Sequence, residues 1–366
     1  MKNRILALAI LLGSVVPAGA ADFAAVTPNR SFQFPRDHGA HPEFKTEWWY
    51  FTGHLQDREG RTYGFQWTVF RSALRPPAPG IQPTASPWRA EQIFLGHLAL
   101  SDLSRRRFSF EEGAARAALG LAGAGSEGFQ VWLPGFSAET GDGETRLRGE
   151  KGDLSLDLRL ELPQQAWLHG QDGYSPKSRE PGKASYYYSM PNVTVRGILK
   201  KDGRERAVQG QAWMDHEFGS GQLGPEQSGW DWMGLPLGNG EALMVYRLRD
   251  RKDPARDFIY GGFLKSDGSW QSLATEDLQL QPAGFWRSPR SGGNYPLEWR
   301  VRVPKQEIDL RVKAAFADQE LDTRKSTQVV YWEGSVEITG HSGQRQVESK
   351  GYLEMTGYAR NFEQDL

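Results

Sequence analysis

The chain has 366 residues, with 44 basic and 45 acidic side chains, a formal net charge of −1 and no cysteine. Without cysteine there is no disulfide scaffold, iron–sulfur cluster, thiolate zinc site or cysteine nucleophile, and the balanced charge gives no basic footprint for nucleic acid. The 13 Trp, 12 Tyr, 18 Phe, 42 Gly and 21 Pro favour strands and turns over helices.

The first 20 residues have the pattern of a secretory signal peptide. Lys2 and Arg4 precede an apolar core at 5–16, and Ala18-Gly19-Ala20 fits the small-residue cleavage site. The apolar core is shorter than the about 20 residues that a membrane span needs, and no second run of that length follows. The sequence therefore predicts a cut after Ala20, a periplasmic or secreted location, and no transmembrane segment in the mature chain.

The remaining chain shows the period-two alternation that is typical of half-buried strands. Clear alternation covers 63–69, 154–162 and 297–303, and turn signals such as Gly238-Asn239-Gly240 separate the runs. Further apolar or alternating runs cover 93–100, 193–199, 242–248, 258–264, 308–314, 329–338 and 352–358. Only 114–121 suggests a short helix. Antiparallel strands at this spacing predict an all-β fold of sandwiches or barrels.

Part of the pattern repeats within the chain. Residues 48–55 (WWYFTGHL) match 230–237 (WDWMGLPL), and later segments, 187–197 with 331–340 and 210–213 with 351–354, match in the same order. These matches predict two copies of one all-β unit, at about 30–215 and 220–360. We therefore expect an N-terminal domain over 21–217 and a C-terminal domain over 218–366. Ligand sites often lie at such domain interfaces.

The segment WMDHEFG at 213–219 falls at the junction of these two units. It places Asp215, His216 and Glu217 in a row, and Asp231 follows between two tryptophans. A carboxyl group among apolar rings is kept protonated because it has lost its hydration, and a protonated carboxyl is a general acid. The alternative for 215–217 is a solvated turn that joins two strands.

A second polar segment lies at 37–48. Glu47 begins an aromatic strand and is expected to point into the mouth of a barrel. His38, His41 and Glu43 are of types that ligate metals. The segment has no tight metal signature, however, and neither does His216-Glu217. We therefore predict no metal site.

Four segments resemble the carotenoid 1,2-hydratase (hydroxyneurosporene synthase) or AttH-like family, over about residues 32–358. They are EWWYFTGHL at 47–55, SYYYSM at 185–190, GQAWMDHEFG at 210–219 and GWDWM at 229–233. The resemblance implies two tandem lipocalin-like antiparallel β-barrels packed against each other. Members of the family include hydratases of apolar polyenes, and others with no assigned activity are often labelled secreted hydrolases.

On this resemblance, Asp215, His216 and Glu217 occupy the Asp-His-Glu of the family motif, and Asp231 falls in the second motif. Phe218 stands where many of the hydratases have Trp, a departure that bears on substrate and activity. The resemblance also implies that substrates bind in the cleft between the two barrels.

The first functional hypothesis is an extracytoplasmic hydratase or lyase, without a cofactor, that acts on an apolar, unsaturated isoprenoid-like or lipid-like molecule. Asp215 or Asp231 would protonate carbon, and His216 would orient the attacking water, with Glu217 and Glu47 as further catalytic candidates. Aromatic rings would stabilise the carbocation through cation–π attraction. The predicted ligand-binding residues are Trp48, Trp49, Tyr50, Tyr187, Trp213, Phe218, Trp230 and Trp232.

Two other classes of function stay open. The aromatic residues would also line the pocket of a non-catalytic carrier of a hydrophobic molecule, as in single-barrel lipocalins. A secreted hydrolase ranks third, because the sequence has no G-x-S-x-G elbow and no evident nucleophile–base pair. In all three cases the predicted partner is a small hydrophobic molecule and not nucleic acid. The sequence predicts no oligomeric state.

Overall fold

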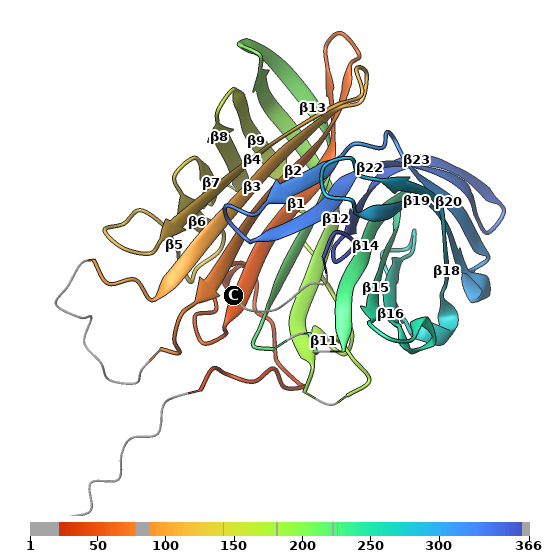
Figure 1. The fold of residues 1–366 in the computed structure, drawn as a ribbon, viewed down its shortest axis with the longest axis horizontal. Helices are drawn as coiled ribbons and strands as arrows, with labels where there is room; N and C mark the ends of the chain where they lie inside the picture. The colour runs from red at the N-terminus through yellow and green to blue at the C-terminus, as the bar shows by residue number, and fades with distance from the viewer. Residues whose placement is uncertain are drawn as a thin grey trace, which may run out of the picture.

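The computed structural model describes residues 22–77, 88–141, 143–180, 182–221, 223–224 and 226–360. The predicted signal peptide, at 1–20, lies outside these residues. Two large antiparallel β-sheets stand side by side, the first built from the N-terminal part of the chain and the second from the C-terminal part (Figure 1). We call them the N-terminal sheet and the C-terminal sheet.

The N-terminal sheet has 13 strands, and 11 of them follow the order β4-β3-β2-β1-β13-β12-β9-β8-β7-β6-β5, with β10 and β11 also pairing with β12. Its strands are β1 (Thr46–Asp57), β2 (Thr62–Ala73), β3 (Gln92–Asp102), β4 (Arg107–Arg116), β5 (Gly123–Ala124), β6 (Gln130–Leu133), β7 (Phe136–Gly141), β8 (Glu144–Lys151), β9 (Leu154–Glu161), β10 (Trp167–Leu168), β11 (Tyr174–Pro176), β12 (Ala184–Lys201) and β13 (Arg204–Gly219). A short 3-10 helix, η1 (Arg36–His38), precedes β1.

The C-terminal sheet has 10 strands, and nine of them follow the order β17-β16-β15-β14-β23-β22-β20-β19-β18, with β21 also pairing with β22. Its strands are β14 (Gln227–Gly238), β15 (Glu241–Asp250), β16 (Phe258–Leu264), β17 (Trp270–Leu273), β18 (Gln279–Arg287), β19 (Asn294–Val303), β20 (Ile308–Ala314), β21 (Glu320–Thr323), β22 (Val329–Ser342) and β23 (Arg345–Met355). Its 3-10 helices are η2 (Pro254–Arg256), η3 (Thr275–Asp277) and η4 (Pro304–Gln306).

The two sheets share one strand order. β4-β3-β2-β1-β13-β12-β9-β8-β7 in the first corresponds, strand for strand, to β17-β16-β15-β14-β23-β22-β20-β19-β18 in the second. In this correspondence β1 is equivalent to β14, in agreement with the sequence match between 48–55 and 230–237. The repeat noticed in the sequence therefore has a counterpart in the topology. The exact domain border stays a prediction, and position 217–218 lies inside β13.

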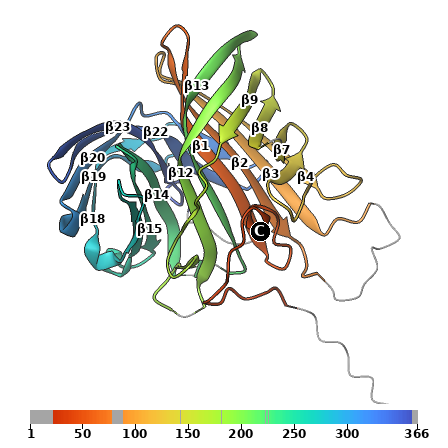
Figure 2. The same ribbon diagram turned by 180° about the vertical axis from the view of Figure 1, so that it is seen from behind.

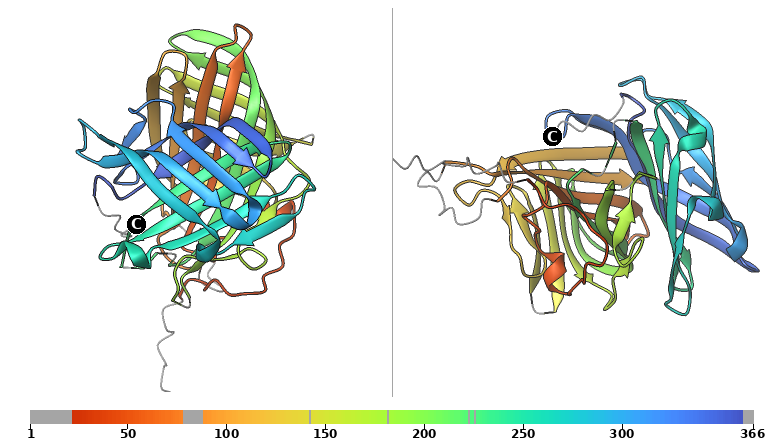
Figure 3. Two further views of the ribbon diagram at one scale, coloured as in Figure 1. Left: turned by 90° about the vertical axis from the view of Figure 1, so that its right-hand side faces the viewer. Right: turned by 90° about the horizontal axis from the view of Figure 1, so that it is seen from below.

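Each sheet curls around an apolar core of its own, as the end-on views in Figure 3 show. Trp49, Phe51 and Trp67 are among the buried residues of the first core, and Trp299 and Trp332 are among those of the second. Along the hydrogen-bonded order of the described strands the sheets stay open, ending at β4 and β5 and at β17 and β18. The prediction of an all-β fold of antiparallel sheets is confirmed.

A third apolar cluster lies between the two sheets and joins them. It contains Tyr50 and Trp213 from the first sheet and Trp232 and Tyr352 from the second. The view from behind in Figure 2 shows the two sheets meeting along β12 and β14. The two sheets lie close together at Gly64, where an added Cβ would lie 2.6 Å from Tyr352 Oη. Glycine at this position therefore permits the contact.

One expectation from the sequence is wrong. Residues 114–121 do not form a helix, because β4 continues to Arg116 and pairs with β3. The alanines there supply local helix propensity, and the ladder of tertiary hydrogen bonds overrides it. In the described part of the chain, no helix has both the length and the apolar character required to traverse a membrane.

Candidate active site

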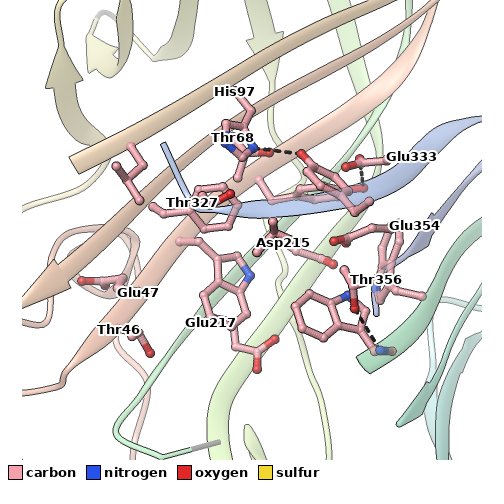
Figure 4. A pocket seen from close by; sticks show the side chains of 18 of the residues that line it. Thr46, Glu47, Thr68, His97, Asp215, Glu217, Thr327, Glu333, Glu354 and Thr356 are labelled. Atoms are coloured by element: carbon pink, nitrogen blue, oxygen red, sulfur yellow. Dashed lines mark hydrogen bonds between the residues drawn. The ribbon is translucent and has the colours of Figure 1, made fainter. Parts of the chain in front are cut away.

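A cavity of about 220 Å³ lies where the two sheets meet. Both sheets contribute to its wall, and Figure 4 shows Asp215 from the N-terminal sheet and Glu333 and Glu354 from the C-terminal sheet around the same space. The lining residues from β1, β2, β3, β12 and β13 include Trp48, Tyr50, Thr68, Phe70, His97, Tyr187, Asp215 and Glu217, and those from β14, β15, β22 and β23 include Trp230, Trp232, Tyr246, Leu248, Tyr331, Glu333 and Glu354.

Strand alternation decides which of the predicted residues reach this cavity. β1 pairs with β13 so that Trp48 faces Glu217 and Tyr50 faces Asp215. Because neighbouring side chains on a strand point to opposite faces, these four share the face that is turned toward the C-terminal sheet. His216 points to the other face.

Asp215 is the central polar group of the cavity. Its side chain accepts hydrogen bonds from Tyr187 Oη at 2.6 Å, from Trp213 Nε1 at 2.7 Å and from Ser189 Oγ. Burial raises the pKa of Asp215 to about 7, although these three hydrogen bonds favour the ionised form and act in the opposite direction. Asp215 therefore has the pKa of a group that can both give and take a proton near neutral pH.

Two carboxyl groups on the opposite wall of the cavity were not predicted from the sequence. Glu333 and Glu354 face each other in the ladder of β22 and β23, and Glu333 Oε1 accepts a hydrogen bond from Tyr50 Oη at 2.7 Å. Burial and the neighbouring charge of Glu354 raise the pKa of Glu333 well above its ordinary value. Burial, with smaller contributions from the charges of Asp215 and Glu217, raises the pKa of Glu354 to about 8.

A signal for these two residues is present in the sequence. Each is a single acidic residue inside an otherwise apolar strand, in VVYWEGSV at 329–336 and in YLEM at 352–355. An unpaired charge is seldom buried in such a strand without a functional or structural reason. In the structure, Glu354 faces Trp232 in the ladder as Asp215 faces Tyr50, so Glu354 is the counterpart of Asp215 in the C-terminal sheet.

Glu217 lines the same cavity, and a cation compensates it. Lys177 Nζ lies 2.9 Å from Glu217 Oε1, and the same ammonium stands over the rings of Tyr187 and Tyr246 at 4.7 and 4.4 Å. Glu217 is therefore an ion-paired carboxylate at one end of the cavity.

Glu47 and His216 belong to a buried network that adjoins the cavity. Glu47 also lines the cavity wall, and its carboxylate contacts His216 Nε2 at 2.9 Å, His41 Nδ1 at 2.8 Å and Arg71 Nε at 2.9 Å. Burial alone would raise the pKa of Glu47, but hydrogen bonds from both histidines and the charges of His41 and Arg71 hold it well below its ordinary range. Burial lowers the pKa of His216.

The nearest approach to a metal-binding group among the described residues is His41, Glu47 and His216, whose ligand atoms lie within 4.8 Å of one another. Every ring nitrogen of this group is already hydrogen-bonded, His41 to Asp37 and Glu47 and His216 to Glu47 and Tyr188. The guanidinium of Arg71 also contacts the carboxylate that a cation would need. The donor set therefore fits a hydrogen-bonded network better than a metal.

His38, His41 and Glu43, which are of types that ligate metals, do not come together in the structure. His38 Nδ1 contacts Tyr188 Oη at 2.6 Å, whereas the half-exposed Glu43 lies 3.9 Å from Arg30. The proximity of these residues in sequence is lost because η1 and the following turn direct the side chains apart.

Asp231 is not brought to the cavity. Its carboxylate lies 2.8 Å from Arg247 and 2.6 Å from Arg249 and accepts a hydrogen bond from Tyr358 Oη at 2.9 Å. The expectation of a carboxyl wedged only among tryptophan rings is therefore wrong. Trp230 and Trp232 flank it in sequence but project from the opposite face of β14, where they line the cavity.

The predicted aromatic residues also divide into those that line the cavity and those that do not. Trp48, Tyr50, Tyr187, Trp230 and Trp232 line the cavity. Three others lie behind it: Trp213 donates its Nε1 hydrogen to Asp215, Trp49 stacks on His216 with ring centroids 5.0 Å apart, and Phe218 stacks on His41 at 3.6 Å.

Comparison with known proteins places this geometry in a family. A crystal structure of a Nitrosomonas europaea protein described as an AttH is 34% identical, with a TM-score of 0.81, and the match covers 92% of this chain and all of that one. The crystal structure of kievitone hydratase from Nectria haematococca has the same fold, with 13% identity, a TM-score of 0.69, and coverage of 93% of this chain and 97% of that one.

The dehydratase asqC of Emericella nidulans is 20% identical over 229 residues. The match covers 60% of this chain and 64% of that dehydratase, so this chain corresponds to under two thirds of that relative. The family model described as AttH-like matches residues 25–358. The chain is a member of the AttH-like family.

Proposed function

We propose that this protein is a lyase that adds water to, or removes it from, an apolar unsaturated molecule bound between the two sheets. The observation that carries the proposal is Asp215, a buried carboxyl group with a pKa of about 7 on the wall of a cavity rich in aromatic rings. Two similar proteins are named as a hydratase and a dehydratase, which supports this class of reaction.

The residues suggest the following chemistry in the hydration direction. Protonated Asp215 gives its proton to one carbon of the double bond, and the positive charge that forms on the other carbon lies among the rings of Trp48, Trp230 and Trp232. Water then attacks that carbon and loses a proton to the Asp215 carboxylate, so the group returns to its starting form. Dehydration is the reverse sequence.

Glu333 and Glu354 serve this reaction as neutral groups. Their raised pKa values keep them protonated near neutral pH, and a protonated carboxyl donates a hydrogen bond. In the proposed reaction they donate hydrogen bonds to the oxygen of the substrate or of the incoming water, and so orient it. Glu217, which is paired with Lys177, marks the polar end of the cavity.

We further propose that the protein acts outside the cytoplasm, because residues 1–20 have the pattern of a secretory signal. Mass spectrometry of the N-terminus of the protein isolated from its own cells tests this. A mature chain that begins at Ala21 supports it, and a chain that retains the apolar segment contradicts it.

The lyase proposal is tested by incubating the purified protein in H₂¹⁸O with a panel of apolar alkenes and tertiary alcohols, followed by mass spectrometry of the products. Incorporation of ¹⁸O by hydration, or loss of water from an alcohol, is expected. Asp215→Asn should lower turnover by about 100-fold to 10,000-fold. Glu348→Gln makes the same chemical change at an exposed position on β23 and should leave turnover unchanged.

Two results would count against the lyase. One is Asp215→Asn retaining full turnover of a confirmed substrate. The other is a panel without any turnover, combined with native mass spectrometry that shows a co-purified, chemically unchanged lipid, and this result supports the carrier instead. A hydrolase is disfavoured, because the buried Ser189 beside His169 does not line the cavity.

A further inference from the structure

Asp215 is linked to two buried side chains that do not line the cavity. Ser189 Oγ contacts Asp215 Oδ1, and it lies 2.7 Å from His169 Nε2. Backbone pairing fixes both positions: Ser189 faces Asp215 in the ladder of β12 and β13, and the His169 N–H donates to the Tyr187 carbonyl. Ser189 and His169 have no exposed surface. The three side chains form one continuous hydrogen-bonded chain.

The chain has only two consistent directions, because a serine hydroxyl has one proton to donate. When Asp215 is ionised, Ser189 donates to Oδ1, and Ser189 Oγ must accept the proton on His169 Nε2. When Oδ1 carries a proton, it donates to Ser189 Oγ, and Ser189 donates to a bare Nε2. The single ring proton of His169 then resides on Nδ1. The tautomer of His169 therefore changes when Asp215 gains or loses a proton at Oδ1.

The ring of His169 stays neutral in both states. His169 Nδ1 is buried and has no hydrogen-bond partner within the described part of the chain, so a doubly protonated ring would leave a buried donor unpaired. Burial, assisted by the charge of Lys177, also holds the pKa of His169 well below its ordinary value. Other titratable groups facing this chain are Tyr187 and Tyr260 beside His169, and Tyr187, Glu217 and Glu354 beside Asp215.

We propose that Ser189 and His169 couple the tautomer of the His169 ring to the protonation of Asp215. Compared with the ionised state, the protonated state holds one more proton in total: the Nε2 proton of His169 has moved to Ser189 Oγ, the hydroxyl proton of Ser189 has moved to Asp215 Oδ1, and the added proton is on His169 Nδ1. One proton enters and one reaches the carboxylate, so the imidazole and the hydroxyl end uncharged. The proposal rests on the proposed function in one respect: the lyase reaction is what consumes the proton of Asp215.

This arrangement differs from that of a serine hydrolase. In a Ser-His-Asp triad the carboxylate orients the histidine, and the histidine takes the proton of the serine. Here the carboxyl group bonds to the serine, while the histidine terminates the chain. Ser189 and His169 are accordingly positioning residues, which set where the proton of Asp215 resides.

The test is ¹⁵N NMR of the full-length protein labelled at its histidines, titrated from about pH 5 to about pH 9, on either side of the Asp215 pKa. The chemical shifts of Nδ1 and Nε2 distinguish the two tautomers. We expect His169 to carry its proton on Nδ1 at the acid end and on Nε2 at the alkaline end. Its signals are identified by their loss in His169→Gln.

Ser189→Ala is the decisive variant, because it keeps both Asp215 and His169 and removes the link between them. In this variant the tautomer of His169 should no longer depend on pH. His97, which bonds to Tyr331 and Ser326 in the same protein, is the internal control and should give the same signals in both proteins.

A His169 tautomer that stays constant over this range in the wild-type protein overturns the proposal, whether or not Asp215 titrates. A proton that resides on Asp215 Oδ2, next to Tyr187, would give that result. A pH-dependent tautomer that persists in Ser189→Ala also overturns it. Since no turnover is measured, a failed relay and a failed lyase assignment are separate results.

Discussion

Two groups of buried carboxyls lie close to each other in this protein, and they have opposite acidities. Asp37 and Glu47 have no exposed surface, yet contacts to arginine and histidine hold the pKa of each well below its ordinary range. Asp215 and Glu333 are almost as deeply buried, and burial raises their pKa values. Burial by itself therefore does not make an acid catalyst. The decisive difference is whether histidine and arginine side chains accompany the carboxyl group, as they do at Asp37 and Glu47.

The predicted catalytic carboxyl groups differ in the same way, by the presence or absence of an arginine partner. Glu47 contacts Arg71, and Asp231 contacts Arg247 and Arg249, so both are ion-paired structural groups in the N-terminal and C-terminal sheets respectively. Within the described residues, the hydrogen bonds that Asp215 receives all come from neutral donors. A sequence motif contains the carboxyl residue but does not show its partner, so it cannot distinguish Asp215 from Glu47 and Asp231.

The largest expected effect comes from removing the cation behind Glu47. Arg71→Met leaves a buried carboxylate without its charged partner, and we expect the free energy of unfolding to fall by about 3 to 5 kcal/mol. Urea denaturation measures this loss. Adding Glu47→Gln should recover part of it, whereas Arg311→Met, at an exposed ion pair with Glu298, should cost much less. A loss below about 1 kcal/mol for Arg71→Met would remove the distinction between the two groups.

A matched pair of substitutions should change stability in opposite directions. Asp231→Asn removes a charge that compensates two guanidinium groups and should destabilise the protein by about 2 to 4 kcal/mol. Asp215→Asn removes a carboxyl that is costly to ionise, so at about pH 8 it should stabilise the protein by about 1 to 3 kcal/mol. Thermal unfolding of both variants checks this, and the same sign for both contradicts it.

The pH dependence of stability should show both groups. The raised pKa values of Asp215 and Glu354 mean that the native state binds protons that the unfolded chain has lost, so the free energy of unfolding should fall by several kcal/mol from about pH 5 to about pH 8. The lowered pKa of Glu47 acts at the acid end, where its contribution is lost as the pH falls below the ordinary value for glutamate.

Equilibrium urea unfolding across the pH range measures this dependence. In Asp215→Asn the decline between about pH 5 and about pH 7 should become smaller, because one of the two groups is gone. Stability that rises over this interval in the wild-type protein would mean that the cavity carboxyls are already ionised.

The smallest effect is expected at Phe218, where the family resemblance of the sequence would place Trp. The side chain is fully buried against His41 and Tyr186 and does not line the cavity. Phe218→Trp should therefore cost about 1 kcal/mol through overpacking and change ligand affinity by less than about threefold. Calorimetry with a confirmed ligand tests this, and a larger change in affinity would mean that Phe218 contributes to the cavity wall.

The strands could be predicted from the sequence, but the environment of each carboxyl group could not. Alternation at 154–162 and 297–303 predicted β9 and β19 directly, because one buried face imposes a period of two. The partners of Asp231 come from β15, and those of Glu47 from β2 and β13 as well as its own segment. Such long-range pairings depend on strand register, which a single sequence does not specify.

The aromatic wall of the cavity makes the protein its own optical reporter. Trp48, Trp230 and Trp232 line the space, while Trp299 and Trp332 are sealed in the core of the C-terminal sheet. A conjugated molecule that enters the cavity comes next to the first three tryptophans and can accept excitation from them, which lowers their emission. Partial quenching of intrinsic fluorescence can thus identify ligands for this protein without a label, before any reaction has been observed.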